Sequence, residues 1–132
     1  MSKPMNPDER KKPARPYSPL VKSGHSIYIS GQIAKDPSTG MLAKGDITVQ
    51  TKQVLSNIFG LLASIGQTKA QIVKTTVYLT RVDDFEAMNA VYREAFGENF
   101  PARSTVCVKA LMNPEALIEI EAIASLPQSN SR

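Results

Sequence analysis

The segment Phe100-Pro101-Ala102-Arg103-Ser104-Thr105-Val106 opens a run of alternating side chains near the end of the chain. Pro101 cannot donate a backbone hydrogen bond to a sheet, so we expect the strand to begin after it. Arg103, Thr105 and Cys107 then share one face, because side chains alternate along a strand. The guanidinium of Arg103 offers a planar pair of donors suited to a carboxylate or a phosphate. The alternative is a surface arginine in an ion pair, which is the commoner use of arginine.

Alternating segments bounded by turn residues predict five strands. These segments cover residues 17–22, 26–30, 70 or 71 to about 80, 104–109 and 117–124. The sequence leaves open whether a further short strand forms near Met41. In the third segment Val73, Thr75, Val77 and Leu79 lie on one face. In the last one Glu119 and Glu121 lie opposite a row of isoleucines.

Two segments with helical spacing of apolar residues predict two helices. Asp46 is a good N-cap for the first helix, and Gly66 ends it. Its apolar face consists of Ile47, Val54, Leu55, Ile58, Leu61, Leu62 and Ile65. Asp83 and Glu86 resemble a capping box at the start of the second helix, which Gly97 ends. Its buried stripe consists of Phe85, Met88, Tyr92, Ala95 and Phe96.

The order β-β-α-β-α-β-β predicts an α+β fold, in which a mixed β-sheet has both helices packed on one face. The opposite face of that sheet then lacks a cover. Because an apolar sheet face is rarely left in water, we expect copies of the chain to associate through it.

The chain of 132 residues has a formal charge of +4, and most of this charge lies at the N-terminus. Residues 1–15 carry five basic and two acidic side chains, and they show no apolar periodicity. We therefore expect a flexible basic tail over residues 1–15, one domain over residues 16–126, and a short C-terminal tail over residues 127–132. Contact of the basic tail with RNA is the less favoured alternative to simple solvation.

Cysteine and histidine occur once each, as Cys107 and His25. One cysteine allows no internal disulfide and no multi-cysteine zinc site, and one histidine allows no histidine metal cluster. No metal and no organic cofactor are expected. The sequence also lacks a signal-like apolar core and a membrane-spanning run, so the cytoplasm is the default location.

Six motifs occur in an order that is typical of one family. They are Pro16-Tyr-Ser-Pro19, Ser30-Gly-Gln-Ile33, Val73-Lys-Thr-Thr-Val-Tyr-Leu79, Asp84-Phe-Glu-Ala-Met-Asn89, Phe100-Pro-Ala-Arg-Ser-Thr105 and Ile118-Glu-Ile-Glu-Ala-Ile-Ala124. Together they resemble the RidA/YjgF family of reactive-intermediate imine deaminases. The resemblance implies a chorismate-mutase-like α+β subunit, a barrel-like homotrimer, and clefts between subunits that bind 2-imino or 2-keto acids.

The resemblance also implies a role for individual residues. Arg103 matches the arginine that holds the substrate carboxylate, and Glu119 matches the glutamate that orients the hydrolytic water, with Glu121 as the alternative on the same strand face. The remaining matches are substrate-binding positions: Tyr17, Ser30, Gly31, Asn89 and Thr105. Two departures affect the shape of the expected pocket, namely a longer loop at Met112-Asn113-Pro114 and a cysteine at position 107, where relatives often have glutamate.

The implied reaction is the hydrolysis of 2-aminoacrylate, 2-iminopropanoate or 2-iminobutanoate to a 2-keto acid and ammonia. Two other functions stay open: a regulatory trimer that binds keto acids without turnover, and an endoribonuclease or translation inhibitor. If the last two strands formed a plain hairpin, Arg103 would pair near Ala124, about 17 Å along the strand from Glu119. A site that contains both side chains therefore requires either a different pairing or two chains.

Overall fold

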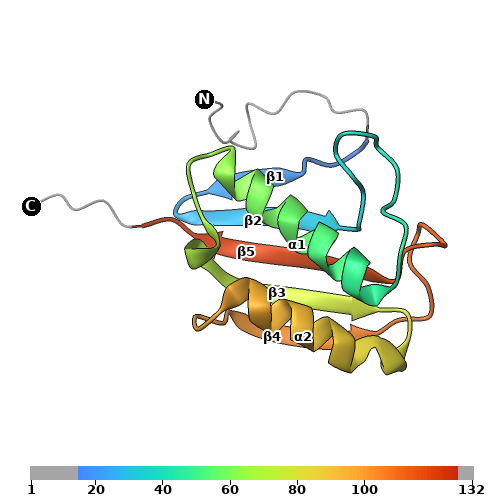
Figure 1. The fold of residues 1–132 in the computed structure, drawn as a ribbon. Helices are drawn as coiled ribbons and strands as arrows, with labels where there is room; N and C mark the ends of the chain where they lie inside the picture. The colour runs from blue at the N-terminus through green and yellow to red at the C-terminus, as the bar shows by residue number, and fades with distance from the viewer. Residues whose placement is uncertain (1–14, 128–132) are drawn as a thin grey trace, which may run out of the picture.

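Five β-strands form one mixed sheet, and both helices cover the same face of it (Figure 1). The computed structural model describes residues 15–127. The strand order is β1-β2-β5-β3-β4. Neighbouring strands run antiparallel except β3 and β4, which are parallel. The predicted α+β class is therefore confirmed. Residues 1–14 and 128–132 lie outside the described residues, and they make up nearly all of the two predicted tails.

The elements follow one another in the predicted order. They are β1 (Leu20–Ser23), β2 (Ser26–Gln32), α1 (Ile47–Ala63), β3 (Ile72–Leu79), α2 (Phe85–Phe96), β4 (Ala102–Cys107) and β5 (Ile118–Ser125), with short 3₁₀ helices at Lys69–Gln71 and Val82–Asp84. In place of a strand near Met41 there is a single bridge between Lys35 and Leu42. The first strand begins three residues later than expected, at Leu20 rather than Tyr17.

The start of α1 and the end of α2 agree with the sequence, whereas α1 ends at Ala63 with Ser64 as its C-cap, before the expected Gly66. Asp46 caps α1 by accepting a hydrogen bond from the Val49 amide at 3.2 Å. Gly97 ends α2 with a φ of 71°, a value that glycine adopts without strain. The predicted capping box at Asp83 is wrong. Asp83 lies within a 3₁₀ turn, and the N-cap of α2 is Asp84, whose side chain makes no capping hydrogen bond.

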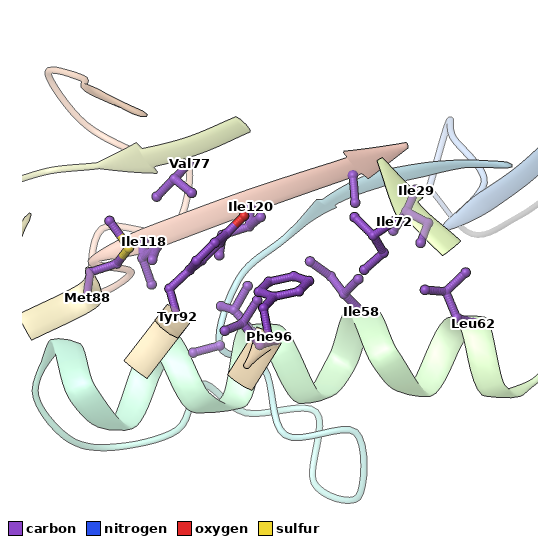
Figure 2. Packing of buried hydrophobic residues seen from close by; sticks show 14 of the residues in the cluster. Ile29, Ile58, Leu62, Ile72, Val77, Met88, Tyr92, Phe96, Ile118 and Ile120 are labelled. Carbon is purple, nitrogen blue, oxygen red and sulfur yellow. The ribbon is translucent and has the colours of Figure 1, made fainter. Parts of the chain in front are cut away.

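The core lies between the two helices and the sheet (Figure 2). Ile58 and Leu62 of α1 lie near Ile29 of β2 and Ile72 of β3, and Met88 of α2 lies beside Ile118 of β5. Ile58, Ile118 and Ile120 are fully buried. The rings of Phe59 and Phe96 meet edge to face at 5.5 Å between centroids, which joins the two helices. The predicted stripe of α2 is correct for Met88, Tyr92 and Phe96. Phe85 departs from it because its side chain is 37% exposed at the sheet edge.

A bulge near the start of β3 changes which residues are buried. The register with β5 shifts between Ile72 and Lys74, so Ile72 takes the buried position that the alternation assigned to Val73. Ile72 is 6% exposed and Val73 is 48% exposed. The expectation that Val73 shares a face with Thr75 is therefore wrong, because an extra residue in one strand reverses the alternation beyond it.

The hairpin considered for the last two strands does not form. β5 lies between β2 and β3, whereas β4 lies at the edge of the sheet, parallel to β3. Arg103 is therefore level with Thr75 of β3, which in turn is level with Ala122 of β5. A complete strand separates Arg103 from the strand that carries Glu119.

Among residues 15–127, no helix covers the face of the sheet opposite α1 and α2, which we call the uncovered face (Figure 1). Tyr28 of β2 and Val106 of β4 are 48% and 45% exposed. Self-association through this face stays a prediction. No helix within residues 15–127 is long and apolar enough to span a bilayer.

Candidate functional site

The residues expected to form one site fall into two groups in the structure. Four of them, Tyr17, Ser30, Gly31 and Glu119, line an open groove of about 1360 Å³. The other three, Arg103, Asn89 and Thr105, lie at the β4 edge of the sheet and are absent from the groove lining.

Three segments that are distant in sequence form the groove. One precedes β1, one is the end of β2 with the residues after it, and one is the loop before β5. The lining residues are Arg15, Tyr17, Pro19, Ser30, Gly31, Gln32, Ile33, Lys35, Met112, Asn113, Pro114, Glu115, Glu119 and Glu121. The longer loop at Met112-Asn113-Pro114 thus forms one wall, which agrees with the expected effect of that loop on pocket shape.

Ser30 connects two parts of this lining. Its hydroxyl donates a 2.7 Å hydrogen bond to the Ser18 carbonyl, and its amide donates at 3.0 Å to the Pro19 carbonyl. These bonds hold the segment before β1 against β2, and Tyr17 immediately precedes that segment. Because the hydroxyl proton is already donated to the Ser18 carbonyl, the Ser30 hydroxyl can offer a ligand only its acceptor lone pairs.

Gly31 allows the side chain of Glu119 to lie directly against the backbone of β2. A Cβ atom at position 31 would overlap the Glu119 carboxylate and lie 2.8 Å from its Cδ. The ladder between β2 and β5 is also interrupted here, between Ile29 and Gln32. Glycine is therefore needed at position 31 for close approach. The sequence indicated a close approach to Gly31, and the structure identifies Glu119 as its partner.

The two glutamates of β5 differ in their surroundings. Glu119 is half-buried against Gly31, whereas Glu121 is exposed at the groove. Partial burial raises the pKa of Glu119, and the negative charge of Glu121 raises it further. A carboxylate with a raised pKa accepts a proton more readily, which is the property required of a general base. Of the two alternatives, Glu119 therefore has the environment suited to activating a water.

Tyr78 of β3 is a neighbour of this carboxylate pair that sequence reasoning did not assign to the site. It is level with Glu119 across the β3–β5 ladder. Burial and the negative charges of Glu121 and Glu119 raise the pKa of Tyr78 above its ordinary value. Only the pairing of β3 with β5 reveals this neighbour, and that pairing joins residues about 40 positions apart.

Arg103 lies on the other face of the sheet, beneath α2. Its guanidinium carbon is 4.7 Å from the ring centroid of Tyr92 and 5.9 Å from that of Phe85, and Nη1 is 3.9 Å from Met88 Sδ. Within residues 15–127, no carboxylate forms an ion pair with Arg103. The alternative for Arg103, a surface arginine in an ion pair, is therefore not found within residues 15–127. The guanidinium is half-buried on an aromatic ring, a cation–π arrangement that fixes its plane and leaves its donors available.

Thr105 and Asn89 belong to the same edge of the sheet as Arg103. Thr105 follows two residues later on β4, and it is level with the buried Val77. Asn89 lies four residues after Phe85 on α2, so the two side chains occupy one side of the helix. Arg103 and Thr105 therefore share the helix-covered face of β4, whereas Asn89 is placed on α2.

Strand alternation explains why the two groups are separate. Arg103 is level with Thr75, which is 1% exposed beneath the helices. Glu119 lies between the buried Ile118 and Ile120 and so projects to the uncovered face. One copy of the chain therefore places its guanidinium and its carboxylate on opposite faces of the sheet.

The described residues also bear on metal binding and on thiol chemistry. No group of three or more histidine, cysteine, aspartate or glutamate side chains in that part of the chain is arranged to hold a metal ion. His25 is in the turn between β1 and β2, and Cys107 is an exposed free thiol at the end of β4.

Residues 8–126 match the family described as Endoribonuclease L-PSP. A human 2-iminobutanoate/2-iminopropanoate deaminase is 44% identical over 109 residues, which are 83% of this chain and 79% of the human protein. This chain belongs to the RidA/YjgF family. The crystal structure of the E. coli YjgF gene product is similar, with 38% identity and a TM-score of 0.81 over 94% of this chain and 98% of that one. A RutC family protein of Pyrococcus horikoshii is 50% identical over 113 residues, which are 86% of this chain and 89% of the archaeal protein.

We predict that Gly31→Ala moves the Glu119 side chain away from β2 in this RidA/YjgF chain without unfolding it. The new methyl group would meet the flexible end of a side chain rather than backbone, so the carboxylate can swing into solvent. Loss of its partial burial then lowers the pKa of Glu119 toward the ordinary glutamate value. Carboxyl ¹³C NMR titration measures this change directly.

Gly60→Ala is the matched control, because nothing lies within 4 Å of a Cβ built there and the residue is exposed in the last turn of α1. It should leave the Glu119 titration unchanged and raise stability slightly, by about 0.5–1 kcal/mol. An unshifted Glu119 titration in a folded Gly31→Ala protein would show that the glycine does not set the environment of this carboxylate.

Proposed function

We propose that this chain hydrolyses reactive 2-imino and 2-enamino acids to 2-keto acids and ammonia. The substrate class includes 2-aminoacrylate, 2-iminopropanoate and 2-iminobutanoate. The observation that carries the proposal is Arg103, a half-buried guanidinium that is oriented by Tyr92 and has no carboxylate partner among the described residues. The name of the human relative supports the same substrate class.

In the proposed reaction Arg103 binds the substrate carboxylate through two parallel N–H donors. This contact fixes the plane of the adjacent C=N carbon and so turns attack by water into a positioned reaction. Thr105 of β4 and Asn89 of α2 would contact the rest of the substrate.

Glu119 would accept a proton from the attacking water as the water oxygen bonds to C2. As the C=N bond opens, the nitrogen takes up this proton and a tetrahedral carbinolamine forms. The carbinolamine then collapses: its hydroxyl gives up a proton as the C=O bond forms, the C–N bond breaks, and the nitrogen takes up that second proton and leaves as ammonia, with the 2-keto acid as the other product. One water is consumed and no electron is transferred, so the reaction needs no redox partner. No covalent nucleophile is required either, and Cys107 has no part in the scheme.

Because the two groups lie on opposite faces of one sheet, we propose that the active site forms between copies of the chain. The uncovered sheet face is the surface through which a homotrimer would assemble. In that assembly Arg103 of one copy would meet the Glu119 groove of another. The groove lining from Tyr17, Ser30 and Gly31 would complete the pocket.

The endoribonuclease alternative receives less support from the groove. Its lining carries three glutamates, Glu115, Glu119 and Glu121, against Arg15 and Lys35, so it has no excess of positive charge to attract a nucleic-acid backbone. The only histidine of the sequence, His25, lies in the β1–β2 turn and is not part of the lining. A keto-acid-binding trimer without turnover would use the same arginine, and only a rate measurement separates it from the deaminase.

We predict that Arg103→Lys lowers kcat/KM for freshly generated 2-iminopropanoate by at least about a hundredfold, equivalent to about 3 kcal/mol. Lysine retains the charge but loses the planar two-point contact that orients the carboxylate. Arg93→Lys is the control, because Arg93 also lies over an aromatic ring, Phe100, at 5.6 Å, but belongs to an exposed position. It should retain wild-type turnover. Wild-type ammonia release by a folded Arg103→Lys protein would contradict the proposed carboxylate clamp.

We predict that the acidic limb of the pH–rate profile depends on Glu121. If ionised Glu119 is the base, kcat/KM falls as the pH drops through its pKa, and the raised pKa places this fall above the pH expected for an ordinary glutamate. Glu121→Gln removes the neighbouring negative charge, so the limb should move to lower pH while burial keeps it above the ordinary value. Glu98→Gln, at an exposed carboxylate beyond α2, serves as the control. A limb that stays in place or moves upward in Glu121→Gln would mean that Glu119 is not the titrating base.

A further inference from the structure

A polar stripe on α1 contacts both walls of the groove from behind. Gln50, Gln53 and Asn57 follow one another at helical spacing and share one side of the helix. Gln50 is only 3% exposed, which is unusual for glutamine. None of the three is part of the groove lining.

Gln50 forms a two-point contact with the loop before β5. Its Nε2 donates to the Glu115 carbonyl at 3.1 Å, and its Oε1 accepts from the Leu117 amide at 2.8 Å. Leu117 precedes the first residue of β5, so its amide lies outside the sheet ladder. The side-chain amide of Gln50 therefore substitutes for a neighbouring strand at this position.

The same loop is braced internally. Asn113 accepts from the Glu115 amide through Oδ1 at 2.9 Å and from the Ala116 amide through its carbonyl at 3.0 Å. Leu117 also accepts from the Thr80 amide at 3.2 Å. The turn thus has a fixed shape of its own, and Gln50 fixes where this turn lies relative to α1.

Asn57 makes the equivalent contact with the opposite wall. Its Nδ2 donates to the carbonyls of Lys35 at 2.8 Å and Ile33 at 3.3 Å, and Gln53 orients the amide by donating to Asn57 Oδ1 at 2.9 Å. Ile33 and Lys35 both line the groove. One rigid helix therefore holds both walls through hydrogen bonds to their backbones.

We propose that Gln50 and Asn57 are positioning residues that fix the two walls of the groove and, through Leu117, the placement of Glu119 two residues further along β5. Neither residue would touch the substrate. The role in catalysis rests on the proposed deaminase function, but the placement of Glu119 is a structural property that can be measured without turnover.

Besides the polar stripe on α1, several ionisable side chains lie near Glu119, and they stay the same when Gln50 is changed. These neighbours are Glu121 on the same strand, Tyr78 on β3, and Arg15, Lys35 and Glu115 at the groove. Gln50 is uncharged and contacts none of them through a side chain, so a change at this position acts on Glu119 through the backbone of the loop.

The test compares Gln50→Met with Thr51→Val in the full chain. Methionine has the length of glutamine but can form neither hydrogen bond. Thr51 is the adjacent residue on α1, is fully buried, and its hydroxyl has no hydrogen-bond partner, so valine there removes a buried polar atom without releasing a wall. Carboxyl ¹³C NMR titration of Glu119 and steady-state deamination of 2-iminobutanoate are measured on both variants and on the wild type.

In Gln50→Met we expect the Glu119 pKa to fall toward the ordinary value, because the released loop lets the carboxylate reach solvent. We expect kcat to fall by about tenfold with KM nearly unchanged, since the Arg103 clamp lies on the other face of the sheet. Thr51→Val should match the wild type in both measurements. A Glu119 titration and a kcat that are the same in Gln50→Met as in Thr51→Val would overturn the proposal.

Two further cases are an inactive wild type and a Gln50→Met variant that does not fold. If the wild type releases no ammonia above the buffer rate, the deaminase function fails, and the NMR titration alone still decides the positioning role. If Gln50→Met does not fold, amide hydrogen exchange of the wild type decides it instead. Exchange at Leu117 as slow as in the β5 ladder supports the Gln50 contact, whereas exchange as fast as in an exposed loop refutes it.

Discussion

The position of β5 in the middle of the sheet is the constraint on which the site depends. β5 has neighbours on both sides, β2 and β3, and its alternate residues Ile118 and Ile120 are fully buried beneath the helices. Because successive side chains of a strand point to opposite faces, Glu119 and Glu121 must emerge on the uncovered face. Partial burial against Gly31, and then the negative charge of Glu121, raise the pKa of Glu119. The hydrophobic core thus determines on which face the proposed base lies, and its neighbours on that face determine its pKa.

Arg103, in contrast, lies on the face of the sheet that the helices cover. β4 is parallel to β3 at the edge of the sheet, so the guanidinium passes under α2 and lies against Tyr92 and Met88. β4 pairs with β3 in parallel, and β5 lies antiparallel between β2 and β3. One sheet therefore carries two half-sites, with Arg103 on one face and Glu119 on the other. A half-buried cation without a carboxylate partner is costly to maintain unless an anion joins it. A substrate carboxylate at an interface between copies of the chain would supply that anion.

The sequence predicts much of the local structure, because local structure depends on neighbouring residues. Asp46 and Gly97 as helix ends, and the stripe of Met88, Tyr92 and Phe96, follow from capping chemistry and helical spacing. Strand pairing does not follow in this way, since the insertion of β5 between β2 and β3 joins residues far apart in the chain. The bulge at Val73 and the two-point contact of Gln50 also required the structure, because both depend on the register of β5. The motifs identified the site residues individually, but only the topology showed that they form two groups.

The shared active site is tested most directly by mixing two inactive variants, Arg103→Lys and Glu119→Gln, after partial unfolding and reassembly. In a cyclic assembly in which each site takes Arg103 from one copy and Glu119 from the next, about one quarter of the sites in an equal mixture are intact. Ammonia release from 2-iminopropanoate should therefore recover to about one quarter of the wild-type rate, while each variant reassembled alone stays inactive. A mixture that is no more active than the separate variants would contradict a site built from two chains.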